Sequence, residues 1–169
     1  METGCEPPRI VAGMPMYNEE ETIGTVVTMA LRHVDEVICI DDGSSDSSAR
    51  IAEACGATVI RHRGNQGYGA ALKTLFKTTR NSDTDVLVVL DSDGQHDTTD
   101  IPKLIQPILD EEADFTIGSR FVEGGEGNDM PAYRRLGIKV ITAASNLTSD
   151  LDIKDTQSGF RAFSRKAID

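Results

Sequence analysis

Short apolar runs alternate with amphipathic segments along this chain. The apolar runs predict strands at Arg9–Gly13, Glu36–Ile40, Thr58–Arg61, Asp85–Leu90, Phe115–Gly118 and Gly159–Ser164. Between them, apolar residues recur with a period near 3.6, which predicts helices at about Glu20–Arg32, Ser47–Cys55, Tyr68–Thr79, Asp100–Glu111 and Tyr133–Leu147. The run Asp85–Leu90 shows no polar alternation, so we expect that strand to be buried on both faces.

Strands that alternate with helices at this spacing predict an α/β fold with a mostly parallel sheet and helices on both faces. Such sheets bind ligands beyond the carboxyl ends of their strands. Polar residues follow the predicted strands at those ends: Asp41 and Asp42 after the second, Asp91 and Asp93 after the fourth, and Arg120 after the fifth. The sequence therefore predicts a site at that edge of the sheet.

The composition narrows the class of function. The chain has 169 residues, the size of one domain, and its 17 basic against 28 acidic residues give a net charge of −11. This charge argues against broad nucleic-acid binding, which needs basic surface. Three cysteines without CxxC spacing indicate reduced thiols and a cytoplasmic location, and we find no signal peptide or membrane-spanning run. The pattern does not indicate an oligomeric state.

Asp91, Ser92 and Asp93 form the sharpest motif. In an extended chain the first and third side chains point the same way, so the two carboxylates can share one hard cation such as Mg²⁺ or Mn²⁺. Gln95 and His96 follow closely enough to add a ligand or a contact. The alternative is a polar turn after a strand, in which aspartate is common.

Other polar residues suit a nucleotide. Asp41 or Asp42 can accept hydrogen bonds from a ribose or a base, Tyr17 can pack on a base, and Glu19 can take a hydroxyl. Each segment has a plain alternative as an ordinary turn or helix cap. The chain has neither a GxxxxGK[ST] phosphate loop nor the GxGxxG order of a dinucleotide site.

Arginines stand out in this acidic chain because a guanidinium can bind phosphate through two hydrogen bonds. Arg120, Arg134 and Arg135 are the candidates, with surface ion pairing as the alternative. Asp155 is a candidate base or substrate ligand, and its alternative is a plain connection into the last strand.

Taken together, six motifs in order resemble family 2 glycosyltransferases, and within them the polyprenyl-phosphate (dolichyl-phosphate) hexose synthases. They are PMYNE at 15–19, IDDGSSD at 40–46, GNQGYGAA at 64–71, DSDGQH at 91–96, GSRF at 118–121 and DTQSGFR at 155–161. The resemblance implies a GT-A fold and an inverting transfer of a hexose from a nucleotide sugar to a polyprenyl or dolichyl phosphate. It covers essentially the whole chain.

The resemblance also implies residue roles. It assigns nucleotide contacts to Pro15, Tyr17, Glu19, Asp41, Asp42, Gly69, Asp91 and Ser92, and metal ligation to Asp91, Asp93 and Gln95. It assigns the transfer itself to Asp93, to Arg120, Arg134 and Arg135 on the phosphates, and to Asp155 and Gln157 near the sugar. The lipid phosphate is already an anion, so the resemblance requires no strong general base.

Within the resemblance, the motif DTQSGFR at 155–161 favours UDP-glucose over GDP-mannose as the donor. The resemblance also implies that the reaction takes place at the cytoplasmic face of a membrane. Members of the family usually continue beyond this motif, so we expect residues 1–169 to be one catalytic domain, truncated at its C-terminus, that lacks part of the acceptor-binding or membrane region. Three other hypotheses stay open: a transferase with a non-lipid acceptor, a phosphatase of the haloacid-dehalogenase type, and a receiver-like module phosphorylated on Asp91.

Overall fold

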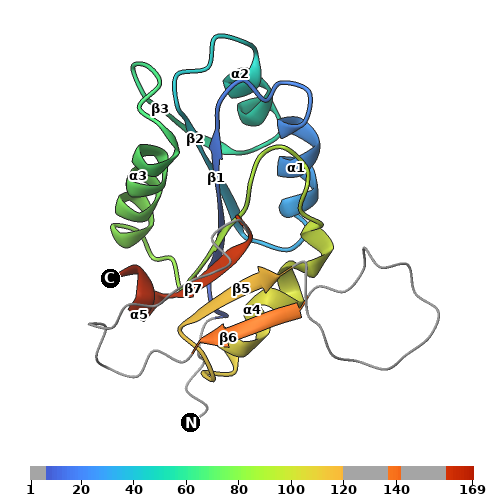
Figure 1. The fold of residues 1–169 in the computed structure, drawn as a ribbon, viewed down its shortest axis with the longest axis vertical. Helices are drawn as coiled ribbons and strands as arrows, with labels where there is room; N and C mark the ends of the chain where they lie inside the picture. The colour runs from blue at the N-terminus through green and yellow to red at the C-terminus, as the bar shows by residue number, and fades with distance from the viewer. Residues whose placement is uncertain (1–6, 120–136, 142–158) are drawn as a thin grey trace, which may run out of the picture.

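The computed structural model describes residues 7–119, 137–141 and 159–169. Within these ranges one sheet of seven strands forms the centre of the molecule (Figure 1). Its order is β3-β2-β1-β4-β7-β5-β6. The strands are β1 Ile10–Met16, β2 Glu36–Asp41, β3 Thr58–Arg61, β4 Val86–Val89, β5 Phe115–Ser119, β6 Gly137–Ile141 and β7 Arg161–Ser164.

Strand pairing in the sheet changes from parallel to antiparallel at β7. The pairs β1–β2, β2–β3 and β1–β4 are parallel, whereas β7 pairs antiparallel with both β4 and β5, and β6 pairs antiparallel with β5. Because two antiparallel pairings separate β5 from β4, β5 runs in the same direction as β1–β4. The predicted mostly parallel sheet is therefore confirmed, and β7 inserts into its middle from the end of the chain.

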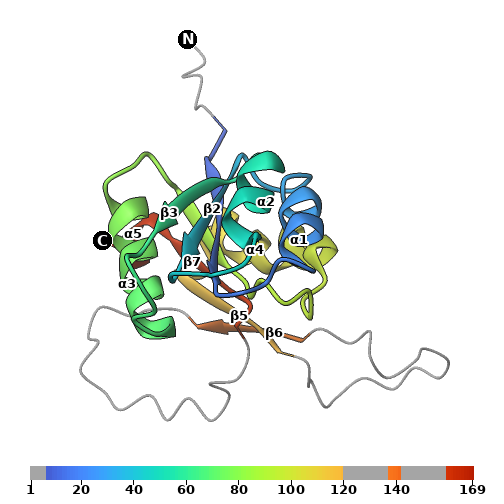
Figure 2. The ribbon, with the colours of Figure 1, turned by 90° about the horizontal axis from the view of Figure 1, so that it is seen from above.

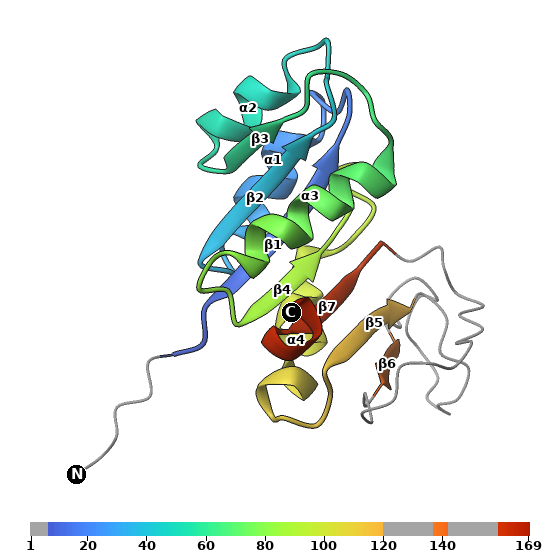
Figure 3. The same cartoon turned by 90° about the vertical axis from the view of Figure 1, so that its left-hand side faces the viewer.

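Helices cover both faces of the sheet, as predicted (Figure 2). On one face α1 Ile23–Ala30, α2 Ser48–Ala54 and α4 Ile101–Leu109 pack through residues such as Val27 and Leu104. On the other, α3 Tyr68–Arg80 and α5 Arg165–Ile168 pack through Leu75 and Ile168. Figure 3 shows α3 crossing one face with α1 and α2 behind the sheet.

The centre of the sheet is buried because its strands carry few polar side chains. All four residues of β4 are buried, as the unbroken apolar run predicts. In β1, the missing side chain of Gly13 makes room for Leu75 of α3, since a Cβ built there would lie 2.3 Å from Leu75 Cδ2. This close helix–sheet contact fixes the position of α3, whose first residues reach the carboxyl edge of the sheet (Figure 1).

One local prediction was wrong. The helix predicted at Tyr133–Leu147 is a strand at Gly137–Ile141, which pairs with β5 residue by residue. Before α4 lies a 3₁₀ turn at Thr98–Asp100, whose cap is Asp97: its Oδ1 accepts from the Thr99 amide at 3.0 Å. Among the helices of the described ranges, none has the length and apolar character needed to cross a membrane.

Candidate active site

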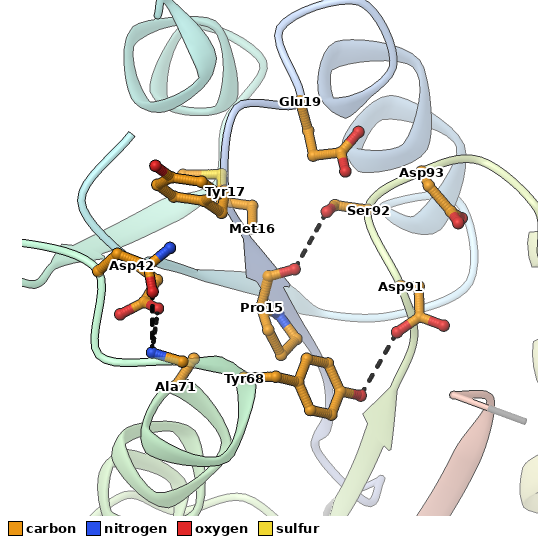
Figure 4. A pocket seen from close by; sticks show the side chains of 12 residues that line it. Pro15, Met16, Tyr17, Glu19, Asp42, Tyr68, Ala71, Asp91, Ser92 and Asp93 are labelled. Atoms are coloured by element: carbon orange, nitrogen blue, oxygen red, sulfur yellow. Dashed lines mark hydrogen bonds between the residues drawn. The ribbon is translucent and has the colours of Figure 1, made fainter. Parts of the chain in front are cut away.

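A cavity of about 360 Å³ opens at the carboxyl ends of β1, β2 and β4 (Figure 4). Residues from these strand ends, from the Gly-rich turn before α3 and from the start of α3 line it: Pro15, Met16, Tyr17, Glu19, Asp42, Asn65, Gly67, Tyr68, Ala71, Asp91, Ser92 and Asp93. The location is the one that a doubly covered α/β sheet offers to ligands. Seven residues predicted from the sequence are among them.

One end of the cavity is organised by Asp42, which is only 4% exposed. Its Oδ1 accepts from His62 Nδ1 at 2.7 Å and from the Gln66 amide at 3.0 Å, and its Oδ2 accepts from the Gly67 amide at 2.7 Å. Burial raises the pKa of Asp42, but these N–H donors outweigh burial and hold the pKa below its ordinary value. The ionised carboxylate thus ties the Gly-rich turn to the end of β2.

Asp41 has a different position. It is fully buried, does not line the cavity, and pairs with Arg61 Nε at 2.8 Å while it also accepts from the Ser44 amide at 2.8 Å. Neighbouring residues at a strand end point to opposite faces, which explains why one aspartate of the pair faces the cavity and the other does not.

The end of β1 forms a second wall. The Pro15 carbonyl accepts from Ser92 Oγ at 3.0 Å, which joins β1 to the turn after β4. Tyr17 follows with 46% of its surface exposed, and Asn18 has a positive φ of 54° that turns the chain towards α1. The Glu19 amide donates to Ser48 Oγ at 2.7 Å, and the Glu19 side chain lines the cavity (Figure 4).

The acidic turn after β4 forms the other end of the cavity. Ser92 is 5% exposed, and its carbonyl accepts from Thr22 Oγ1 at 2.8 Å, so the backbone of the turn is held from both sides. Asp93 Oδ1 accepts from the Gln95 amide at 2.9 Å. The Asp91 and Asp93 side chains both project from this turn at the cavity rim (Figure 4).

Asp91 is the most strongly held carboxylate of the turn. His96 Nε2 lies 3.1 Å from its Oδ2, and the Tyr68 hydroxyl donates to its Oδ1 over 3.4 Å. The hydrogen bond from His96 is the main cause that lowers the pKa of Asp91, against burial that raises it, and Tyr68 and Arg161 act in the same direction as His96. Asp91 is therefore ionised at neutral pH, and the nearby carboxylate raises the pKa of Tyr68 together with burial.

This donor set fits Mg²⁺ or Mn²⁺, which prefer carboxylate oxygens and keep several waters. In the described ranges no group of three or more His, Cys, Asp or Glu side chains forms a complete metal cage. Asp91 and Asp93 would thus hold a cation whose shell is completed by water and by oxygens of the bound molecule. Such an open site suits a cation that bridges protein and ligand.

The structure does not bring every predicted residue to the cavity. Gly69 in α3 and the exposed Gln95 lie in the described ranges but do not line it. The remaining predicted residues lie outside the described residues: Arg120, Arg134, Arg135, Asp155 and Gln157.

Five lining residues were missed from the sequence: Met16, Asn65, Gly67, Tyr68 and Ala71. Tyr68 carried a detectable signal, because an aromatic residue that opens a helix after a Gly-rich turn is placed at a strand-end edge in this class of fold. Met16 and Ala71 lie in the motifs at 15–19 and 64–71, but they were not assigned to the site because apolar residues in a strand and a helix are usual in the core.

The chain is similar in sequence to two transferases that have dolichyl or dolichol phosphate in their names. UDP-N-acetylglucosamine–dolichyl-phosphate N-acetylglucosaminyltransferase of Methanococcus voltae is 32% identical over an alignment of 173 positions, gaps included, which covers 92% of this chain and 69% of that protein. Dolichol-phosphate mannosyltransferase of Pyrococcus furiosus is 34% identical over 166 residues, which cover 92% of this chain and 46% of that protein. The chain thus spans from about half to about two-thirds of the length of these relatives.

Among solved structures, glucosyl-3-phosphoglycerate synthase of Mycobacterium tuberculosis, in complex with Mg²⁺ and uridine diphosphate, superposes with a TM-score of 0.64. It is 26% identical, and the match covers 94% of this chain and 57% of that one. The sequence model of glycosyl transferase family 2 matches residues 12–169. The chain therefore belongs to glycosyl transferase family 2.

Proposed function

We propose that this chain is the donor-binding domain of a metal-dependent glycosyltransferase that moves a sugar from a nucleoside diphosphate to a polyprenyl phosphate. The observation that carries the proposal is that Asp91, Asp93, Asp42 and Tyr17 line one and the same cavity. The two relatives named above carry dolichyl or dolichol phosphate in their names, which supports a lipid acceptor here. The family match favours a transferase over the phosphatase and receiver hypotheses.

The nucleoside would lie at the end formed by Tyr17, Asp42 and Asn65. In the described ranges the large apolar side chains that are exposed are Tyr17, Tyr68 and Leu109, and the two tyrosines both line this cavity. Exposed aromatic rings in a cavity favour stacking on a planar or ring-shaped ligand. For the contact with the nucleobase we assign Asp42, which lines the cavity, and not Asp41, which is fully buried and does not line it.

The diphosphate would lie at the other end, against Asp91, Ser92 and Asp93. A bound Mg²⁺ or Mn²⁺ would supply charge stabilisation for the leaving diphosphate. The chain's own part is to fix the two carboxylates, through the contacts of Ser92 with Pro15 and Thr22. Positioning of this kind is a large component of catalysis when the nucleophile is already charged.

The acceptor phosphate would attack the anomeric carbon in line, and as an anion it needs no strong base. We assign Arg120, Arg134 and Arg135 to the phosphates, and Asp155 and Gln157 to the surroundings of the sugar. A lipid acceptor implies that the intact protein works at a membrane surface.

The donor is tested by a thermal-shift panel of UDP, GDP, UDP-glucose, UDP-N-acetylglucosamine and GDP-mannose, each with Mn²⁺ or with EDTA. A ligand at 100 times its Kd stabilises a protein by about 2.7 kcal/mol, which shifts Tm by roughly 5–11 °C at this chain length. We expect such a shift only with Mn²⁺, with UDP-glucose preferred over GDP-mannose. The absence of any nucleotide-dependent shift in either condition would overturn the proposal.

A non-lipid acceptor is the second candidate, because the superposed structure named above is a glucosyl-3-phosphoglycerate synthase, whose name contains no lipid. Incubation with labelled donor sugar and either polyprenyl phosphate in detergent or 3-phosphoglycerate separates the two. We expect label in the organic phase with the lipid, whereas label in the aqueous acceptor would favour the second candidate.

A further inference from the structure

The Asp91 carboxylate is held by a side chain five residues further along the chain. His96 Nε2 is 3.1 Å from Asp91 Oδ2. A carboxylate can only accept, so Nε2 carries the proton and donates to it. One lone pair of Oδ2 is thereby used on the His96 side, which leaves the carboxylate a defined direction in which to meet a cation.

His96 itself has little freedom. Its side chain is 7% exposed, and its ring stacks on Phe160 with the ring centroids 5.4 Å apart and the planes inclined by 22°. Phe160 is 1% exposed and belongs to the main hydrophobic core. The orientation of His96 is therefore set by the segment that leads into β7.

The position of Phe160 is in turn set by β5. The Gly118 amide donates to the Phe160 carbonyl at 2.8 Å. A Cβ built on Gly118 would lie 2.7 Å from Phe160 Cδ1, so the absence of a side chain at Gly118 makes room for the ring.

Gly159 acts on Asp91 directly. A Cβ built on Gly159 would lie 2.0 Å from Asp91 Oδ2 and 2.4 Å from Cγ, and its three nearest atoms all belong to the Asp91 carboxylate. The φ of Gly159 lies outside the left-handed region, so its backbone accepts alanine. Contact with Asp91 is thus the physical reason for glycine at this position.

We propose that His96 and Gly159 are positioning residues that orient the Asp91 carboxylate towards the cation, His96 by its hydrogen bond and Gly159 by leaving space. This inference rests on the proposed function. It gives a role to Gly159 and Phe160, which belong to the motif at 155–161. Replacement of a residue that hydrogen-bonds to a metal-ligating side chain typically weakens metal binding by roughly 10- to 100-fold. His96 is here such a partner and not itself a ligand.

The test measures the Mn²⁺ dissociation constant by electron paramagnetic resonance, for Mn²⁺ alone and with UDP or GDP, on the full chain. Gly159→Ala displaces the carboxylate. His96→Phe keeps a ring on Phe160 but removes the donor, and His96→Gln restores an N–H group. Glu53→Gln is the control, because Glu53 is exposed on α2 and does not line the cavity. Circular dichroism melts of all variants report on folding.

We expect Gly159→Ala and His96→Phe to weaken Mn²⁺ binding by roughly 10- to 100-fold with melts close to wild type. His96→Gln should recover part of the affinity, and Glu53→Gln should match wild type. Wild-type affinity in folded Gly159→Ala and His96→Phe overturns the inference and leaves the proposed function intact. If Gly159→Ala fails to fold, the two His96 variants decide. A wild-type chain that binds no Mn²⁺ in any condition overturns the proposed function itself.

Discussion

Replacement of Asp42 by asparagine should detach the Gly-rich turn from the sheet. The change keeps the shape of the side chain but removes its charge and turns one acceptor into an NH₂ donor. In the wild type the carboxylate accepts hydrogen bonds from the N–H groups of His62, Gln66 and Gly67 over 2.7–3.0 Å. In the variant the new NH₂ group faces one or more of these N–H donors. At least one of these groups loses its acceptor.

The magnitude follows from those contacts. A hydrogen bond to a charged group contributes about 1.5–3 kcal/mol, and the Gly-rich turn is partly open to water, which moderates the loss. We expect Asp42→Asn to lower the free energy of unfolding by about 2 kcal/mol, which is about 4–8 °C in Tm for a chain of this size. The amides of Gln66 and Gly67 should lose protection from hydrogen exchange.

The effect should depend on pH in one direction. The pKa of Asp42 is lower in the folded protein than its ordinary value, because the N–H donors outweigh burial. Its stabilisation is therefore complete above the unfolded-state pKa of about 3.9 and is lost as pH falls through the folded-state pKa. The Tm difference between wild type and Asp42→Asn should be constant near pH 7 and should narrow below about pH 4.

Melts followed by circular dichroism from pH 3 to pH 8 measure this difference, with Glu53→Gln, on the exposed surface of α2, as the matched loss of one negative charge. Asp42→Asn melting within about 1 °C of Glu53→Gln at pH 7 would refute the role given to this carboxylate. A difference that grows on acidification would refute the sign of the pKa shift.

Two further predictions concern the core. Gly13→Ala would push a Cβ against Leu75 at the β1–α3 contact and should cost about 1–3 kcal/mol in urea unfolding, and an unchanged midpoint would contradict the packing described. Burial, with a smaller contribution from Asp41, raises the pKa of the Cys39 thiol to about 12, so iodoacetamide at pH 8 should label Cys55 in the native protein and leave Cys39 unmodified. Equal labelling of the two by peptide mass spectrometry would speak against a buried Cys39.

Much of the fold was predictable because burial leaves a local pattern. The run at β4 is apolar at every position, which required a strand covered on both faces, and the structure buries all four residues. Ligands of such sheets bind beyond the carboxyl ends of the strands, and the polar turn at Asp91–Asp93 directly follows this strand. The acidic turn could therefore be assigned to the ligand-binding edge before any side-chain position was known.

β6 shows where local patterns fail. A short apolar run such as Gly137–Ile141 fits a helix or a strand, and periodicity alone does not separate them. Its pairing with β5 decides the outcome, and that partner is far from obvious in the sequence.

Local sequence patterns also fail to predict which single residues face the cavity. Asp41 and Asp42 are chemically identical neighbours, and only the register of β2 turns one towards Arg61 and the other towards the cavity. The contact between Gly159 and Asp91 joins segments far apart in the chain, so spacing along the sequence gives no sign of it.

The central claim is that Asp91 and Asp93 hold a divalent cation against a nucleoside diphosphate. Isothermal titration of UDP and GDP into wild type and Asp93→Ala, each with Mn²⁺ and with EDTA, tests it most directly. We expect one nucleotide to bind wild type with Mn²⁺ and to bind at least roughly tenfold more weakly to Asp93→Ala or in EDTA, since removal of a ligand should cost no less than removal of an outer partner. Binding of equal affinity in all four conditions would contradict the account.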